Sequence, residues 1–275
     1  MICLLTGAKG FLAQNISKKI SDKYNIIEFK KPMQPEDIGC VDIIIHCAAE
    51  IYDEKNMFES NVLLTHALLQ KALKDNCKKF IYIGTSSEYG RARRGTTETD
   101  RINPTTLYEA TKGRGTLLTQ AFSRQYGLPG IIVRPYTVYG PYEKEQKLIP
   151  TIFNAYLKKI PFNFVKNPVH DWVYIDEVVS GIEKLLEIDY IPGDIVNFGT
   201  GIQTTNLNIL RIIEKILGEA IPFTEIETFR SYDSNYWKCD NRYAKAQYGI
   251  CFDTDLQTGL EKYEAWMKEG YEKPC

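Results

Sequence analysis

The chain has 275 residues, of which 44% are hydrophobic and 25% charged, and its formal net charge is −1. This composition is ordinary for a globular protein, and the balanced charge argues against nucleic acid or an anionic membrane as the main partner. No apolar run approaches the length that spans a bilayer, and too few apolar residues precede Thr6 for a signal peptide. The seven cysteines are scattered and form no CxxC pair, as expected of reduced thiols. We therefore expect a cytoplasmic protein, and the sequence indicates no metal site.

Apolar, strand-like runs alternate with helix-like segments along the first half of the chain. The continuous apolar run at 41–47 is typical of a strand buried on both faces of a sheet. The expected strands are residues 2–5, 26–29, 41–47, 80–83 and 130–133, and the expected helices are residues 12–21, 58–73 and 108–126. This alternation predicts βαβ units and an α/β fold with a Rossmann-type, doubly wound parallel sheet.

After Arg134 the chain changes character, because prolines and aromatic residues interrupt it. We expect residues 1–165 to form the cofactor-binding domain, with 170–200 partly returning to it. Residues 135–160 and 200–275 are expected to form mainly a smaller, substrate-binding lobe. The segment 30–40 is too short for a further strand and its helix, so this side of the sheet is predicted to be trimmed.

The segment Thr6-Gly7-Ala8-Lys9-Gly10-Phe11 follows the first strand and opens a helix. Gly7 permits a tight turn, and Gly10 lets the backbone approach a diphosphate at the helix N-terminus. Ala13 takes the place of a third glycine and is small enough for close packing of helix and strand. The alternative is an ordinary turn between strand and helix. The expected cofactor contacts in this segment are Gly7, Lys9, Gly10, Phe11 and Leu12.

The end of the second strand bears on the choice of dinucleotide. An acidic residue in this position holds the ribose hydroxyls of NAD, whereas the aligned residue here is Lys30. A cation favours a ribose phosphate, so NADP is slightly preferred to NAD. Glu28 projects from the same face and would support NAD if the alignment is shifted. The remaining alternative is that the lysines at the end of this strand are only solvated.

Tyr108 and Lys112 are four residues apart on the expected long helix, which places both on one face. A nearby cation stabilises a phenolate, and a phenol made more acidic in this way can exchange protons with a substrate hydroxyl or carbonyl. The cluster Thr85-Ser86-Ser87 ends another strand and could supply a hydroxyl to the same site. The alternative for Tyr108 and Lys112 is a solvated pair on the helix surface.

Motifs along almost the whole chain carry a family resemblance. Besides the glycine segment and the Tyr108-xxx-Lys112 pair, they are His46-Cys47-Ala48-Ala49, Asn61-Val62, Thr85 to Gly90, Arg134 to Pro141, His170 to Val178, Asn197 to Gly201, Asp240 and Leu256-xx-Gly259-Leu260. In this order they resemble the extended short-chain dehydrogenase/reductases, the NAD-dependent epimerase/dehydratase family that acts on nucleotide sugars.

The resemblance implies roles for individual residues. Tyr108 would be the general acid/base, Lys112 would bind the nicotinamide ribose and lower the tyrosine pKa, and Thr85 would donate a hydrogen bond to the reacting oxygen. Ser86 or Ser87 could supply this hydroxyl if the loop is shifted. Further implied cofactor contacts are Ala48, Ala49, Asn61 and Tyr136, and implied substrate contacts are Ser86, Ser87, Tyr139, His170 and Arg230. Asn61 could instead brace the backbone, and His46 is interpreted as a strand-end residue.

The family contains several reactions. The 4,6-dehydratases carry an acidic pair after the catalytic threonine, and the serines at these positions make a dehydratase unlikely. We favour a 4-keto-sugar reductase that uses NADPH, with an NAD-dependent 4-epimerase as the alternative. A non-catalytic dinucleotide sensor is a second alternative, which the Tyr108 and Lys112 pair disfavours. Relatives form dimers through the helices at 61–73 and 108–126, so a homodimer is expected.

Overall fold

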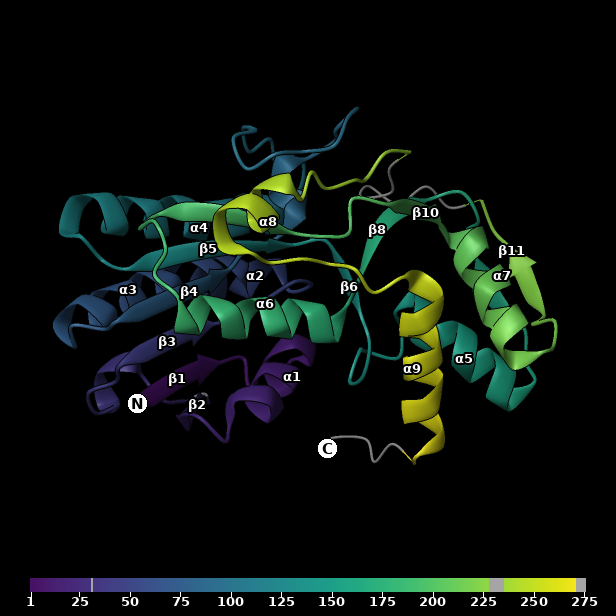
Figure 1. The fold of residues 1–275 in the computed structure, drawn as a ribbon, viewed down its shortest axis with the longest axis horizontal. Coiled ribbons are helices and arrows are strands. Elements are labelled where there is room, and N and C mark those ends of the chain that lie inside the picture. The colour runs from purple at the N-terminus through teal and green to yellow at the C-terminus, as the bar shows by residue number, and fades with distance from the viewer. Residues whose placement is uncertain (31, 228–234, 271–275) are drawn as a thin grey trace.

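The computed structural model describes residues 1–30, 32–227 and 235–270. Its central feature is a six-stranded parallel sheet in the order β2-β1-β3-β4-β5-β9 (Figure 1). These strands are β1 (Ile2–Thr6), β2 (Asn25–Phe29), β3 (Ile43–His46), β4 (Lys79–Ile83), β5 (Gly130–Pro135) and β9 (Asp194–Phe198). The predicted Rossmann-type architecture is confirmed.

The central strands of the sheet are buried on both faces, and most of their residues are apolar. In β3, Ile43 and Ile45 join one core, whereas Ile44 between them joins the other. Successive side chains of a strand point to opposite faces, so a continuous apolar run supplies both cores. Helices α1 (Phe11–Ile20) and α6 (Ile175–Glu187) cover one face, and α3 (Leu64–Lys74) and α4 (Leu107–Tyr126) cover the other (Figure 1).

One edge of the sheet is trimmed, as the short segment 30–40 predicts. Between β2 and β3 the described chain forms only the short 3-10 helix η1 (Pro35–Asp37). It then passes directly to the far side of β1, where β3 pairs with that strand. Strand β2 is therefore the edge of the sheet among the described residues.

The helix expected at residues 58–73 is divided into three parts. Asp53 caps α2 (Glu54–Phe58), a π-helical turn η2 (Glu59–Leu63) follows, and α3 continues from Leu64. Apolar spacing does not reveal a π turn, because the turn adds one residue without interrupting the apolar face. Such turns occur frequently at functional sites, and this one carries Asn61.

The second lobe lies beside the carboxyl ends of the central strands. It contains a three-stranded sheet in the order β10-β8-β6, a two-stranded sheet of β11 and β7, and three helices that gather to the right in Figure 1. These elements are β6 (Thr137–Tyr139), α5 (Leu148–Lys158), β7 (Phe162–Phe164), β8 (Val169–Tyr174), β10 (Gln203–Thr205), α7 (Asn206–Leu217), β11 (Phe223–Glu225) and α9 (Leu256–Lys268). The predicted residue boundaries of the two lobes stay a prediction.

A buried carboxylate joins segments that are far apart in the chain. Asp171 in β8 accepts backbone N–H groups from Thr200 at 2.8 Å and from Gly201 and Cys239 at 2.9 Å. Thr96 exchanges backbone hydrogen bonds with the chain on either side of Cys239. Helix α8 (Arg242–Tyr248) follows directly and returns to the central sheet beside β9.

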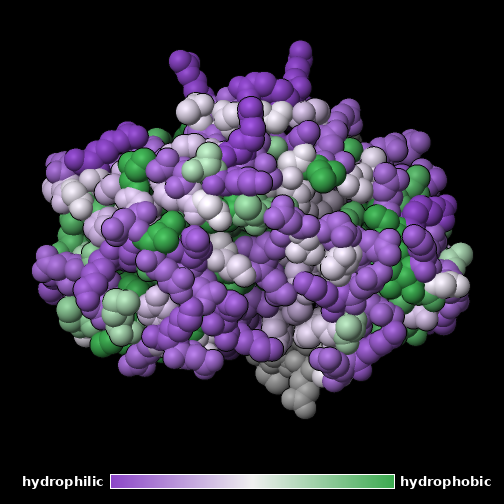
Figure 2. All heavy atoms as spheres, in the orientation of Figure 1, coloured by the Kyte–Doolittle hydropathy of each residue, from purple (hydrophilic) through white to green (hydrophobic). Residues whose placement is uncertain are grey.

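Polar and charged residues cover most of the face seen in Figure 2, and apolar residues occur there in small, separate groups. Within the described ranges, no helix combines the length and the apolar character that crossing a membrane requires. The six cysteines of the described residues are all free thiols.

Candidate active site

The turn between β1 and α1 is shaped to receive an anion. Gly7 has a φ of +72°, and a Cβ at this position would lie 2.9 Å from the backbone of Ala48. Gly10 donates its N–H to the Gly7 carbonyl at 2.7 Å and is the N-cap of α1, which has no side-chain cap and no acidic residue in its first turn. The N–H groups of the first helical residues, from Phe11 onwards, are therefore available to the diphosphate of a dinucleotide, which the helix dipole would attract. The residues present fit such a cofactor.

The other predicted residues of this segment differ in their surroundings. Lys9 is exposed, whereas Phe11 and Leu12 are partly buried and pack against the core. Phe11 and Leu12 would thus meet a phosphate through their backbone N–H groups rather than their side chains.

Lys30, on which the preference for NADP depends, has an anionic partner. Its Nζ lies 2.6 Å from Glu28 Oε2, and both side chains are exposed. The two residues share a face, as expected, but the carboxylate offsets the charge that would attract a ribose phosphate. An exposed ion pair is weak and can exchange partners, so this geometry supports neither dinucleotide over the other.

His46 at the end of β3 connects three elements. Its Nδ1 lies 2.7 Å from Thr6 Oγ1 in β1, and its Nε2 lies 2.9 Å from Thr65 Oγ1 in α3. Thr6 Oγ1 also accepts the Ala48 N–H at 3.0 Å. Burial lowers the pKa of His46 from 6.5 to about 3, with a smaller contribution in the same direction from Lys112. His46 is therefore a neutral, structural residue at the end of its strand.

Asn61 uses its side chain to brace the loop that follows β3. Its Oδ1 accepts the Glu50 N–H at 2.7 Å, and its Nδ2 donates to the Glu50 carbonyl at 2.9 Å and to Thr111 Oγ1 at 3.0 Å. The residue is 1% exposed. These contacts join the loop after β3 to α4, so Asn61 braces the backbone, and its contact with a cofactor stays a prediction.

The hydroxyl cluster follows β4 and forms a short 3-10 helix, η3 (Ser86–Tyr89), which Thr85 caps. Thr85 Oγ1 accepts the Ser87 N–H at 3.2 Å, and the Thr85 N–H donates to Glu88 Oε1 at 3.0 Å. Ser86 is buried and Ser87 is partly buried. Of the three hydroxyls, that of Thr85 is the one that acts on Tyr108, because it opposes the rise of the Tyr108 pKa. The structure therefore favours Thr85 over the two serines as the hydroxyl of this site.

Tyr108 and Lys112 lie one turn apart on α4, beside the end of β4. Lys112 is 2% exposed, its Nζ donates to the Ile83 carbonyl at 2.6 Å, and its ammonium lies 4.4 Å from the centre of the Tyr82 ring. Burial lowers the pKa of Lys112 to about 8, and the carboxylate of Glu88 and the thiol of Cys47 act in the opposite direction.

The expected lowering of the Tyr108 pKa by Lys112 is not what this structure shows. Burial raises the pKa of Tyr108 to about 12, the Glu88 carboxylate adds to this rise, and the hydrogen bond with Thr85 opposes it. Lys112, whose ammonium donates to the Ile83 carbonyl, is not among the groups that act most on the Tyr108 pKa. At neutral pH Tyr108 is a neutral phenol that can donate a proton.

Tyr136, predicted to line the nicotinamide region, follows β5 and is 7% exposed. Its hydroxyl forms a short hydrogen bond with Thr96, and its ring meets Trp237 edge to face. Ala48 and Ala49 are partly buried in the loop after β3. These residues surround the carboxyl ends of the central strands, where parallel sheets bind ligands.

The predicted substrate residues lie in different surroundings. Tyr139 is 1% exposed and packs against Trp172 and Tyr174 in the core, and its assignment as a substrate contact stays a prediction. His170 is partly buried, and its Nδ1 lies 3.2 Å from Thr137 Oγ1 at the start of the second lobe. Arg230 lies outside the described residues.

Sequence reasoning missed the role of Glu88 and of its partner Arg134. Their side chains are 0% and 1% exposed, and Arg134 Nη2 lies 2.8 Å from Glu88 Oε2. The available signal was an acidic residue directly after a run of small hydroxyl residues at the end of a buried strand. A charge in such a position requires a partner of opposite sign.

Comparison with known proteins agrees with this geometry. A sequence model of the NAD dependent epimerase/dehydratase family matches residues 34–199. The chain belongs to this family. The matched range contains the Asn61, Thr85, Tyr108 and Lys112 positions, and it begins after the glycine segment.

Individual members of the NAD-dependent epimerase/dehydratase family are similar over different lengths. A trifunctional UDP-glucose 4,6-dehydratase/UDP-4-keto-6-deoxy-D-glucose 3,5-epimerase/UDP-4-keto-L-rhamnose-reductase of Arabidopsis thaliana is 27% identical over 98% of this chain and 47% of its own length. A dTDP-D-glucose 4,6-dehydratase of Dictyostelium discoideum is 31% identical over 64% of this chain and 45% of its own length. The chain thus spans less than half the length of these two relatives.

A solved structure has the same fold over nearly the whole chain. The UDP-glucuronic acid 4-epimerase from Bacillus cereus, in complex with UDP-glucuronic acid and NAD, superimposes with a TM-score of 0.88 at 22% identity, covering 98% of this chain and 100% of that one. At this identity the comparison shows the fold alone.

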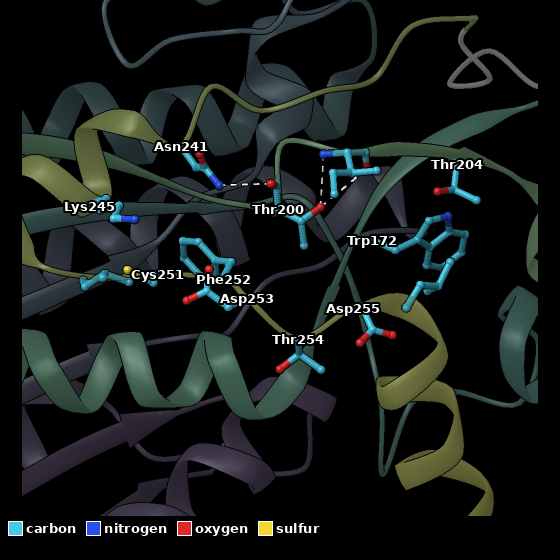
Figure 3. A pocket seen from close by; sticks show the side chains of 13 residues that line it. Trp172, Thr200, Thr204, Asn241, Lys245, Cys251, Phe252, Asp253, Thr254 and Asp255 are labelled. Atoms are coloured by element: carbon cyan, nitrogen blue, oxygen red, sulfur yellow. Dashed lines mark hydrogen bonds between the residues drawn. The ribbon is translucent and has the colours of Figure 1, made fainter.

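A cavity of about 390 Å³ lies apart from the residues described above (Figure 3). Trp172 of β8, Thr200 after β9 and the segment 250–256 line it, and Asn241 donates to the Thr200 carbonyl at 3.0 Å on one side. Neither Thr85, Tyr108 nor Lys112 lines this cavity, so it is separate from the candidate active site of this family member.

The buried His46 predicts an acid-sensitive stability. Because the unfolded chain binds a proton near pH 6.5 and the folded chain only near pH 3, stability is retained above pH 6.5 and falls as the pH decreases towards 3. Between about pH 7.5 and about pH 5, His46 alone should reduce the free energy of unfolding by about 2 kcal/mol. Urea denaturation at both pH values would measure this, and His46→Gln should remove that part of the pH dependence. An unchanged pH dependence in the variant would contradict the assignment.

Proposed function

We propose that the protein is an NAD-dependent nucleotide-sugar 4-epimerase. The observation that carries the proposal is the placement of Tyr108, Thr85 and the buried Lys112 at the carboxyl end of β4, on the same edge of the parallel sheet as the anion-binding turn at Gly7. These are the groups that proton transfer to and from a sugar hydroxyl requires during hydride transfer.

Two considerations move our preference from the reductase to the epimerase. The preference for a reductase rested largely on Lys30 as a reader of NADP, and Lys30 is paired with Glu28. In addition, the solved structure with the same fold over nearly the whole chain is a 4-epimerase in complex with NAD. An epimerase that retains NAD between turnovers does not need a cation to bind a ribose phosphate, because NAD has none.

The residues of this chain would divide the proton chemistry among them. When bound, a dinucleotide would supply reversible hydride chemistry at carbon 4 of the sugar, and epimerisation requires the hydride to return to the other face of the 4-keto sugar. Tyr108 would take the proton of the 4-hydroxyl and later give a proton back, and Thr85 would hold the reacting oxygen by a hydrogen bond. Lys112 would hold a ribose hydroxyl. The turn at Gly7 and Gly10 would bind the diphosphate at the N-terminus of α1.

A 4-keto-sugar reductase is the second candidate, and one observation favours it. Burial and the Glu88 carboxylate raise the pKa of Tyr108 to about 12, so the residue is a phenol at neutral pH. A phenol suits a reduction, in which a carbonyl gains a hydride and then a proton. The epimerase needs the phenol for one half of its cycle and the phenolate for the other half.

The exclusion of a dehydratase is not confirmed, because curated relatives include 4,6-dehydratases. Ser86 and Ser87 nevertheless offer no carboxylate for the elimination of water. A dehydratase is therefore an outcome to be tested rather than part of the proposal.

The deciding experiment identifies the cofactor and the product together. Bound dinucleotide is released from the purified protein and identified, and UDP- and dTDP-hexoses and UDP-glucuronic acid are followed by NMR. The epimerase predicts bound NAD and interconversion of 4-epimers without net consumption of a dinucleotide. NADPH consumption with a 4-keto sugar would establish the reductase instead. Loss of water from a 4-hydroxy sugar would establish the dehydratase, and absence of all turnover would establish the sensor.

Tyr108→Phe should decrease kcat by about 10²- to 10⁴-fold because it removes the acid/base group. The binding of dinucleotide should be unchanged, since the ring remains in place. Steady-state kinetics and a dinucleotide titration measure the two effects. Tyr126→Phe, at the other end of the same helix, is the control and should retain wild-type turnover. Equal activity of both variants would contradict the role of Tyr108.

We also propose a homodimer that forms through α2, η2 and α4. Exposed apolar side chains lie on these packed segments, namely Phe58, Leu63, Leu107 and Leu117, each at 46% to 53% exposure. Leu117→Lys should shift the protein to a monomer in sedimentation velocity. Leu157→Lys on α5, at a similarly exposed position, is the control and should leave the dimer intact. A wild-type monomer would exclude the proposal.

A further inference from the structure

A buried ion pair lies directly beneath the hydroxyl cluster. Glu88 Oε2 accepts hydrogen bonds from Arg134 Nε at 3.0 Å and from Arg134 Nη2 at 2.8 Å, and neither side chain is more than 1% exposed. Two charges removed from water carry a desolvation cost that their attraction often only offsets. Apolar side chains could fill the same space, so packing alone does not explain why this position holds two charged residues.

The remaining contacts of Glu88 connect it to the candidate active site. Its Oε1 accepts the backbone N–H of Thr85 at 3.0 Å, and its Oε2 accepts the hydroxyl of Thr116 in α4 at 2.7 Å. A Cβ at position 84 would lie 2.6 Å from Oε1, so the glycine there leaves room for this carboxylate. One side chain thus joins the Thr85 turn, the helix that carries Tyr108 and, through Arg134, the strand that leads to Tyr136.

Arg134 is itself fixed from the other side. Its guanidinium lies 4.4 Å from the centre of the Tyr89 ring, and the Tyr89 hydroxyl donates to Asn197 Oδ1 of β9 at 2.8 Å. Glu88 is therefore anchored to the central sheet through Arg134, with its Oε1 directed at the backbone of Thr85.

We propose that Glu88 is a positioning residue, which holds Thr85 against Tyr108 in the geometry that proton transfer requires. The inference rests on the proposed hydride-transfer function and deepens it. Glu88 acts through Thr85 and α4 and not through contact with a substrate. Arg134 holds the carboxylate in place through its two hydrogen bonds.

The charge of Glu88 has a second effect on the same site. After burial, the Glu88 carboxylate is the largest of the influences that raise the pKa of Tyr108. The other groups that act on Tyr108 are Thr85, Tyr52 and Glu109, and Tyr82 is coupled to it from β4. Removal of the Glu88 charge should therefore lower the pKa of Tyr108 and move the acidic limb of the kcat/KM profile to lower pH.

Glu88→Gln is the first test. Glutamine keeps the shape of Glu88 but has only one side-chain oxygen. When this oxygen accepts the hydrogen bond from Thr85, the NH2 group faces the Arg134 guanidinium, which is itself a donor. We expect kcat to decrease by about 10- to 100-fold with little change in KM, as for a small misplacement of catalytic groups. The acidic limb should move to lower pH. Unchanged kcat and an unchanged pH profile would overturn the proposal.

Asp75→Asn is the matched control, because Asp75 and Lys71 form another buried ion pair at 2.8 Å, at the C-terminal end of α3. This variant should lose stability comparably but retain the wild-type kcat and pH profile. A decrease in kcat equal to that of Glu88→Gln would show that loss of any buried pair has the same effect, which would overturn the proposal.

A second variant separates positioning from folding. Glu88→Leu with Arg134→Met replaces the pair by apolar side chains, a change that proteins often tolerate without loss of stability. The Thr85 N–H would still lack its acceptor, so kcat should stay at or below the value of Glu88→Gln. Recovery of wild-type kcat in this double variant would show that the pair serves folding alone.

The proposal can also be tested without turnover. In protein labelled with ¹³C at the tyrosine ζ carbon, the Tyr108 resonance is identified by its loss in Tyr108→Phe. A lower Tyr108 pKa in Glu88→Gln than in wild type supports the proposal, and equal pKa values overturn it. A wild-type protein that is inactive on every nucleotide sugar would instead overturn the proposed function.

Discussion

The close approach of α4 to β4 determines the geometry of the candidate active site. A Cβ on Gly115 would lie 2.1 Å from the Tyr82 hydroxyl, so the helix can approach the strand only with a glycine at this position. The Tyr82 hydroxyl donates to the Lys112 carbonyl at 3.0 Å, and Lys112 Nζ donates to the Ile83 carbonyl at 2.6 Å. Helix and strand are thus bonded in both directions. Tyr108 is held beside the end of β4, where Thr85 begins the next turn. The site therefore depends on two rigid elements rather than on loops.

Neutral polar groups organise the neighbouring strand ends, whereas the charged pair lies under the hydroxyl cluster. The side chains of His46 and Asn61 form their hydrogen bonds with other groups of the protein. They thereby fix the end of β3 and the loop after it without introducing a charge there. Glu88 and Arg134 form a buried ion pair next to the Thr85 turn, and Glu88 is the charged group that acts most on the pKa of Tyr108.

Much of the fold could be predicted because it depends on local patterns. The apolar run at 41–47 and the glycines of the first turn specify buried strands and an anion-binding turn whatever their partners are. Features that depend on contacts between distant segments could not be predicted. The burial of Tyr139 follows from Trp172 and Tyr174, which approach it from β8. Likewise, the spacing of Tyr108 and Lys112 predicts that they share a face, but it is silent on the Ile83 carbonyl that engages the ammonium.

The pairing of β5 with β9 has a consequence for the order in which the protein is synthesised. Asn197 in β9 binds the Tyr89 hydroxyl and the Thr96 carbonyl, and β9 closes the edge of β5 more than fifty residues after that strand ends. While the ribosome makes the intervening segment, β5 presents unpaired backbone groups, which are a liability for aggregation. The half of the chain that carries Tyr108 therefore has the full set of its sheet partners only after β9 has emerged.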